Sequence, residues 1–275
     1  MKAALFPLFL AATPALADDT ALIGFMGGQG CTFGPDSRAA AITAGHDASA
    51  IDALITASLK DGRAKQEGAY TVLNAATCTI RLPDIASNYT VNSPEIVAIT
   101  SAIDAYAAEG APGCFLVEPF VAFDALKGKE GAGYFDTLNF LAAAIISGDL
   151  RFYGTSPLTV PPGFQVVTGA CADLPDITAI RRNHDYIVHG FGPFIRALGA
   201  TTPCARKEYD DPSLDLAARL QGVDPKSLVE DPLDVNAWLW MEYTMIALAA
   251  GWREDMTGTE KGTPRPPLCH YPKLG

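Results

Sequence analysis

The sequence predicts an α+β protein, predominantly α-helical with a small β component and built as a single compact disulfide-bonded domain. Three observations indicate this. Apolar residues recur mostly at the three- and four-residue spacing of amphipathic helices, and only a few short runs alternate as strands do. Hydrophobic residues make up 49% of the chain and charged residues 19%, which is enough for a hydrophobic core. The six cysteines are widely spaced, as in a chain whose distant segments are bridged.

The first 17 residues have the three parts of a secretory signal peptide. Lys2 supplies a positive charge, and the apolar run at 3–12 is too short to cross a bilayer. Ala15-Leu16-Ala17 is a small-x-small cleavage site, so we expect cleavage after Ala17 and a single globular domain over residues 18–275. Asp18 stands where a lipid-anchored protein would have a cysteine, so we expect no lipid anchor.

Caps and stops mark the elements of the first 110 residues. Asp47 or Ser49 caps a helix whose apolar residues have helical spacing, and Gly62 is placed to end it. Ser93-Pro94 starts another helix, since proline is favoured at the first helical position. The segments predicted here are a strand at 21–26, helices at 34–45, 47–62 and 93–110, and strands at 70–74 and 77–82.

The later part of the chain mixes both kinds of element. Residues 112–123 are an apolar stretch interrupted by Pro119, and 127–133 form a polar, glycine-rich surface loop. In the helical segment that follows Asp176, the Gly190 to Pro193 region is expected to bend or break the helix. The segments predicted here are a helix at 135–147, strands at 150–153 and 164–168, a helical segment at 176–198, helix starts at the Asp-Pro pairs 211–212, 224–225 and 231–232, and an extended tail at 257–275 fixed by Cys269.

The cysteines predict three disulfides. All six follow the signal peptide, and an even number in an oxidising compartment favours complete pairing. There is no CxxC, which argues against a zinc ribbon or a thioredoxin-type site. Our hypothesis is that neighbours pair, which gives Cys31–Cys78, Cys114–Cys171 and Cys204–Cys269.

The charge balance excludes some partners. The chain has 31 acidic and 20 basic residues, and loss of Lys2 with the signal peptide makes its net charge of −11 one unit more negative. Such a surface repels nucleic acid and anionic headgroups. The most apolar later segment, 233–250, contains Asp234, Asn236 and Glu242, so we expect no membrane span.

Asp185 and His189 are candidate catalytic residues. Four residues apart in a predicted helix, they share a face, and a carboxylate that orients an imidazole is the arrangement of a general base. The same spacing is typical of surface pairing, and no GxSxG or other nucleophile motif accompanies it. His184 lies about 140° around the helix from His189, so the two are not a chelating pair, and we expect His184 to be a hydrogen-bonded core residue.

Glu242 is the third candidate. Its helix is apolar nearly all round, so we expect Glu242 to be partly buried with a hydrogen-bonded or basic partner. The alternative is a solvated edge shared with Asn236. Only a buried Glu242 with a raised pKa would be a credible acid or base.

No cofactor or metal is expected. The glycine-rich turn at 27–30 has Phe33 where a dinucleotide loop has its third glycine, and the chain contains no GK[ST]. The four histidines show no chelating spacing.

Two functions from different classes remain. The first is an exported, soluble periplasmic or secreted protein that acts as a non-catalytic binding or structural module, with an unknown ligand or a protein of the cell envelope as its partner. The alternative is an exported hydrolase that uses Asp185 and His189, with Glu242 as a further candidate. Two ionisable groups converging in one pocket would favour the hydrolase, whereas scattered positions favour the binding module.

Overall fold

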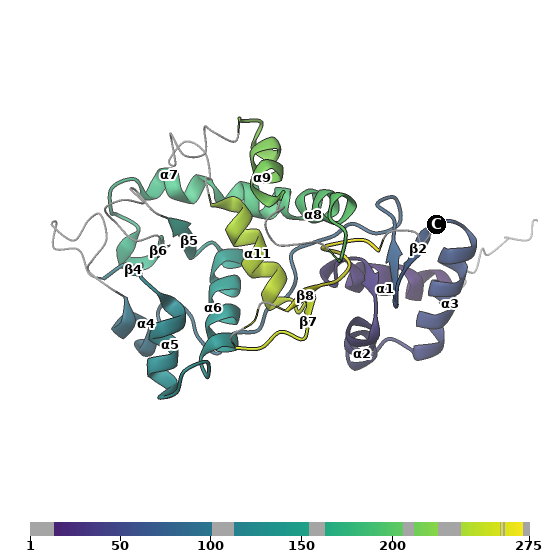
Figure 1. Ribbon diagram of the computed structural model, residues 1–275, viewed down its shortest axis with the longest axis horizontal. Helices are drawn as coiled ribbons and strands as arrows, with labels where there is room; N and C mark the ends of the chain where they lie inside the picture. Colours follow the sequence, from purple (N-terminus) through teal and green to yellow (C-terminus); the bar gives the residue numbers. More distant parts are fainter. Residues whose placement is uncertain are drawn as a thin grey trace, which may run out of the picture.

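The computed structural model describes residues 14–100, 113–153, 163–205, 212–224, 238–258, 260 and 262–271. Helices predominate and the strands form small sheets (Figure 1), so the predicted α+β class is confirmed. The helices are α1 (Pro14–Gly28), α2 (Pro35–Thr43), α3 (Ala48–Lys60), α4 (Pro94–Ile99), α5 (Pro119–Lys127), α6 (Tyr134–Ser147), α7 (Ile177–Arg182), α8 (His184–Thr201), α9 (Ser213–Gln221) and α11 (Leu239–Ala249). The strands are β1 (Thr32–Phe33), β2 (Ala64–Glu67), β3 (Tyr70–Leu73), β4 (Phe115–Leu116), β5 (Leu150–Tyr153), β6 (Gly163–Val166), β7 (Arg253–Glu254) and β8 (Thr263–Pro264).

Helix α1 occupies the segment in which a strand is predicted at 21–26, and that prediction is wrong. The buried side chains of Leu22 and Met26 are four residues apart, which is the spacing of one helix face and not the alternation of a strand. They belong to the hydrophobic core, and α1 contacts both α2 and α3 (Figure 1). The helix also runs through the expected cleavage site at Ala17.

Helix α3 begins at the cap predicted for it, with Asp47 and not Ser49 as the capping residue, and α2 begins within the predicted 34–45. The Asp47 carboxylate accepts hydrogen bonds from the backbone N–H groups of Ser49 and Ala50, at 2.8 and 3.1 Å. At the start of α2, Ser37 Oγ accepts from the N–H of Gly34 at 2.8 Å and donates to the carbonyl of Thr32 at 2.8 Å. Local side-chain chemistry therefore sets both helix starts.

A three-stranded antiparallel sheet of order β1-β3-β2 follows these helices. Strand β3 matches the strand predicted at 70–74, whereas β2 is polar and gives no strand signal. The strand predicted at 77–82 is wrong. Residues 77–82 pair with no described strand and run beside α1 instead, where Arg81 donates its backbone N–H to the Gly27 carbonyl at 3.0 Å.

The second sheet has the order β4-β6-β5, with antiparallel neighbours. Strand β5 lies at the predicted 150–153, and β6 begins one residue before the predicted 164–168. Helix α5 begins within the apolar stretch at 112–123. Pro119, which was expected to interrupt that stretch, is the first residue of the helix. Helix α4 ends at Ile99, and residues 101–110 of the helix predicted at 93–110 lie outside the described residues.

The helical segment predicted at 176–198 divides at Asn183 into α7 and α8. The break predicted between Gly190 and Pro193 is wrong, because α8 continues through Pro193. A Cβ added at Gly190 would lie 2.4 Å from the hydroxyl of Tyr243, and one at Gly192 would lie 2.4 Å from the carbonyl oxygen of Ile80. These glycines therefore permit close packing of α8 against its neighbours.

The C-terminal part packs back onto the rest of the chain. Pro212 is the N-cap of α9, and residues 225–237, which include two predicted Asp-Pro helix starts, lie outside the described residues. The tail predicted as extended contains the β7-β8 hairpin. Beyond it, His270 exchanges backbone hydrogen bonds of 2.9 Å with Cys204 and Thr202.

Three disulfides join neighbours along the sequence, as in the hypothesis above. The bridges are Cys31–Cys78, Cys114–Cys171 and Cys204–Cys269, with sequence separations of 47, 57 and 65 residues. The third bridge fixes the tail to the segment that follows α8. Disulfides of this kind are typical of oxidising compartments.

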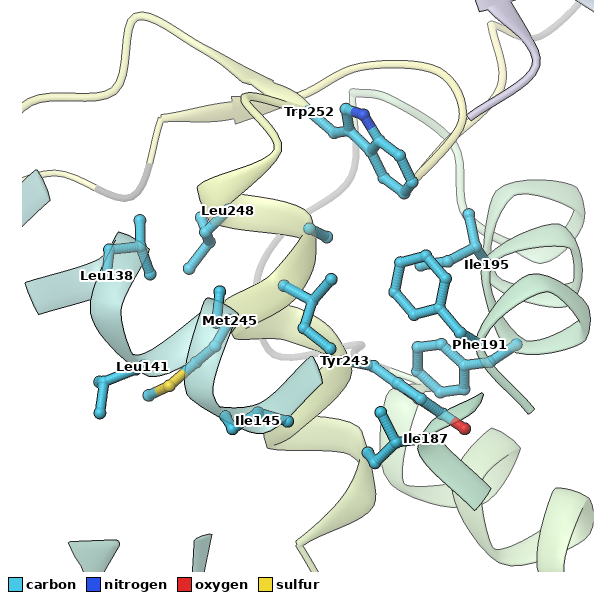
Figure 2. Close-up of a cluster of buried hydrophobic side chains, with 14 of the residues drawn as sticks. Leu138, Leu141, Ile145, Ile187, Phe191, Ile195, Tyr243, Met245, Leu248 and Trp252 are labelled. Carbon is cyan, nitrogen blue, oxygen red and sulfur yellow. The ribbon is translucent and has the colours of Figure 1, made fainter. Parts of the chain in front are cut away.

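The core is centred on α11, which packs against α6 and α8 (Figure 2). Met245 and Leu248 point toward Leu141 and Leu138 of α6, and Tyr243 extends toward α8 (Figure 2). Trp252 is fully buried just beyond the end of α11. None of the helices in the described ranges is both long and apolar enough to cross a membrane.

A pair of glycine substitutions tests the close packing of α8. Gly192→Ala should lower the free energy of unfolding by about 1–3 kcal/mol, because its methyl group would clash with the backbone at Ile80. Gly24→Ala is the matched control in α1, since nothing lies within 4 Å of the added Cβ, and it should stabilise the protein by about 0.5–1 kcal/mol. Urea denaturation measures both values. A stable Gly192→Ala variant would contradict tight packing between α8 and 77–82.

Candidate functional site

The first two turns of α8 carry three of the residues considered from the sequence, His184, Asp185 and His189. Asp185 and His189 are exposed, and His189 Nδ1 lies 3.1 Å from the backbone carbonyl oxygen of Asp185. The hydrogen bond thus involves the main chain of Asp185 and not its carboxylate. His184, on another side of the helix, is partly buried.

His184 contacts a buried arginine. Nη2 of Arg151 lies 2.5 Å from His184 Nδ1. A guanidinium only donates, so Nδ1 accepts and the imidazole is neutral with its proton on Nε2. Burial lowers the pKa of His184 and the charge of Arg151 lowers it further, whereas Asp185 and Asp149 act in the opposite direction.

Arg151 lies on the second sheet and is 1% exposed. Its Nη1 donates to the carbonyls of Ile145 and Leu150, at 3.0 and 2.6 Å, and its Nε has no hydrogen-bond partner. Burial lowers the pKa of Arg151, while the negative charges of Glu242 and Asp149 raise it. Arg151 is therefore a buried cation whose charge is partly balanced by nearby acids.

Glu242 is 0% exposed, which is deeper than the partial burial expected. Its Oε1 accepts a hydrogen bond of 3.0 Å from the backbone N–H of Phe152. Because β5 is an edge strand, Glu242 satisfies a donor that no neighbouring strand takes. This position gives Glu242 a structural role at the sheet edge, close to the charge of Arg151.

A polar hollow of about 440 Å³ lies beside this cluster. Its lining residues come from the end of α6, from α7 and from the start of α8, and they include His184 and Asp185 but neither His189 nor Glu242. Ser147 is the lining residue of α6 that could act as a nucleophile, but its hydroxyl donates to Asp149 at 2.6 Å and to the Ala144 carbonyl at 3.1 Å. The three sequence candidates therefore do not converge here.

A larger pocket of about 610 Å³ lies between α8, α11 and the β7-β8 hairpin. Its lining is mainly apolar and aromatic, with a few hydroxyl groups and one arginine. The apolar residues include Phe194, Ile195, Leu198, Trp240, Met241, Ala247 and Leu268. The polar residues include Thr202, Ser213, Thr244, Arg253 and Thr263.

Thr202 is the notable polar residue of this pocket. It is 6% exposed, and its Oγ1 has no hydrogen-bond partner. Its backbone groups are satisfied, because its N–H donates to Leu198 at 3.0 Å and its carbonyl accepts from His270 at 2.9 Å. Only the side-chain hydroxyl is left unpaired, at a cost of about 1–3 kcal/mol for a buried polar group.

The tail builds one wall of the pocket because α8 lets it approach. A Cβ at Gly199 would lie 2.2 Å from the carbonyl oxygen of Pro267, so only glycine allows the tail to pass here. The Cys204–Cys269 bridge then holds the tail, and both Cys204 and Leu268 line the pocket. The pairing of Cys204 with Cys269, which was a hypothesis from the sequence, was the feature that indicated contact between the tail and the segment after α8.

Within the described part of the chain, no three His, Cys, Asp or Glu side chains come together as metal ligands would. Comparisons with known protein families, with curated proteins and with solved structures found no match. Function is therefore argued from the pocket itself.

The buried acid can be tested by removing its charge alone. Glu242→Gln keeps an oxygen for the Phe152 N–H but removes a negative charge near Arg151, so the free energy of unfolding should fall by about 1–3 kcal/mol. Glu254→Gln, at an exposed position in β7, should change it by less than about 0.5 kcal/mol. Chemical denaturation gives both values. Equal stability of the two variants would contradict the structural role of Glu242.

The His184–Arg151 contact predicts a pH dependence. The unfolded chain has an ordinary histidine pKa of about 6.5, above the lowered value in the folded protein. The neutral imidazole thus contributes stability above about pH 6.5, and this is lost as the pH falls through the folded-state pKa.

Stability measured at about pH 7.5 and about pH 5 separates this contribution from other titrations. His184→Gln should lose less stability on acidification than the wild type does. His189→Gln, at an exposed position of the same helix, should lose as much as the wild type. Equal losses in all three proteins would mean that His184 does not contribute.

Proposed function

We propose that this protein is a non-catalytic binding protein that holds a small, largely apolar molecule in the pocket between α8, α11 and the β7-β8 hairpin. The observation that carries the proposal is that Thr202, whose buried hydroxyl has no hydrogen-bond partner, is one of the residues that line this pocket. A ligand group in the pocket would complete its hydrogen bonding. The partner is therefore a small molecule and not a protein of the envelope.

The size and lining of the pocket support this proposal. A volume of about 610 Å³ falls within the range of about 300–1,000 Å³ that is typical of small-molecule sites. Aromatic and aliphatic side chains with a few hydroxyl groups are also typical. The described lining residues include no Asp, Glu or His, and the hydroxyl of the lining residue Tyr243 already donates to the carbonyl of Tyr186.

The hydrolase alternative has less support. It uses Asp185 and His189, with Glu242 as a further candidate, but Glu242 is fully buried at the sheet edge while Asp185 and His189 are exposed on α8. His189 also contacts the main chain of Asp185 and not its carboxylate. No described feature favours this second function.

The proposal includes export to the periplasm or the extracellular space after cleavage near Ala17. Three disulfides and an acidic composition support it. Leu22 is the first described side chain that is buried, so removal of residues 1–17 would leave this core contact in place. The mass of the exported chain, which should begin at Asp18, tests this part.

Two threonines provide a matched test of the pocket. The hydroxyls of Thr244 and Thr201 both donate to the carbonyl four residues earlier, at 2.8 Å, but only Thr244 lines the pocket. Thr244→Phe should fill the pocket and weaken binding of the neutral dye N-phenyl-1-naphthylamine at least about tenfold, whereas Thr201→Phe should leave it unchanged.

Dye fluorescence measures binding, and thermal melting shows that both variants are folded. Failure of the wild-type protein to bind the dye, or equal binding by two folded variants, would count against the proposed pocket.

A further inference from the structure

We infer that the molecule held in this pocket is an amphiphile with a single anionic, hydrogen-bond-accepting head such as a carboxylate, which lies against Thr202, Arg253 and the start of α9. This inference rests on the proposed function and assigns the chemical class of its ligand. Lining residues, their charge and the ends of two helices support it.

The charge of the pocket differs from that of the whole protein. The chain carries a net charge of −11, yet Arg253 is the only charged residue among the described lining residues. Its Nη1 donates to the carbonyl of Gly262 across the hairpin at 3.1 Å, which holds the guanidinium at the pocket wall. A guanidinium has five N–H donors, so it can hold protein contacts and a ligand carboxylate together.

The helix ends favour the same sign of charge. Ser213, the buried first residue of α9, lines the pocket, and the N-terminus of a helix attracts anions. The end of α8 would repel an anion if its carbonyls were open. However, Leu198 accepts from the N–H of Thr202 at 3.0 Å, and Gly199 accepts from His270 Nδ1 at 3.0 Å.

Thr202 supplies the hydrogen bond that orients the head. Rotation about χ1 can bring its hydroxyl to another staggered position, so the hydroxyl can turn to an acceptor in the pocket. A bond to a charged acceptor is stronger than one to a neutral acceptor. The chain of the ligand would then lie along the apolar lining, which includes Leu198, Trp240 and Met241.

Three ligands with equal chain length and different head groups distinguish the contribution of the head group to affinity from that of the apolar chain. Octanoate, octanol and octylammonium are each used to displace N-phenyl-1-naphthylamine from the wild-type protein. Octanoate should bind about tenfold more tightly than octanol, and octylammonium should bind most weakly. If octanol or octylammonium binds as tightly as octanoate, the anionic head is wrong while the pocket stands. If neither the dye nor any of the three binds, the proposed function fails as well.

Variants of the lining residues test where the anionic head of the ligand lies in the pocket. Arg253→Gln should remove the preference for octanoate over octanol, whereas Arg219→Gln, at an exposed position of α9 outside the lining, should keep it. Thr202→Val should weaken octanoate about tenfold and raise the melting temperature of the ligand-free protein, because it removes a buried hydroxyl without a partner. An unchanged preference in Arg253→Gln, or unchanged octanoate binding in Thr202→Val, would overturn this placement of the head.

Discussion

Burial of α11 is the constraint on which the rest of the structure depends. Apolar side chains surround this helix, so it is stable only when other elements cover it on several sides. Helix α6 covers one side and α8 another, and Trp252 closes the end (Figure 2). The pocket lies where α11 meets the end of α8 and the β7-β8 hairpin, and it exposes Trp240, Met241 and Thr244.

The burial of α11 also determines the surroundings of its acidic side chain. Glu242 is the one acid of α11, and a buried carboxylate must find donors or neighbouring positive charge. The Phe152 N–H provides a donor, and Arg151 provides a positive charge. These polar contacts connect α11 to the edge of the second sheet, and through Arg151 to the start of α8. The same acid that suggested catalysis thus joins three elements of the fold.

The sequence predicted those features that local chemistry determines. The cap at Asp47 and strand β5 appear as expected, because a capping side chain and a run of strand formers each act over short stretches. The three cysteine pairs also agree with the hypothesis that neighbours pair, although the paired cysteines are 47, 57 and 65 residues apart. The strand predicted at 77–82 failed because this segment packs against α1, where the N–H of Arg81 donates to the Gly27 carbonyl, and does not join the sheet. No pattern within one segment reveals such packing.

The candidate site was hidden from the sequence for a related reason. Its lining comes from α8, α9, α11 and the tail, and none of these segments contains a binding motif by itself. Sequence reasoning considered charged and aromatic residues, whereas Thr202 becomes informative only when its burial and its missing partner are known. The Cys204–Cys269 pairing was the one available signal that the tail meets the end of α8.

An unsatisfied buried group does not identify a ligand site by itself. The side chains of Ser58, Gln165 and Asn183 also have buried oxygens without partners, but none of the three lines the large pocket. Thr202 combines both properties, in a wall that also carries positive charge at Arg253. Valine would fill nearly the same volume without the cost of an unpaired hydroxyl, about 1–3 kcal/mol. In the function proposed above, a threonine here lowers the stability of the empty protein and gains a partner when the pocket is filled, which is the expected trade-off between stability and function at a binding site.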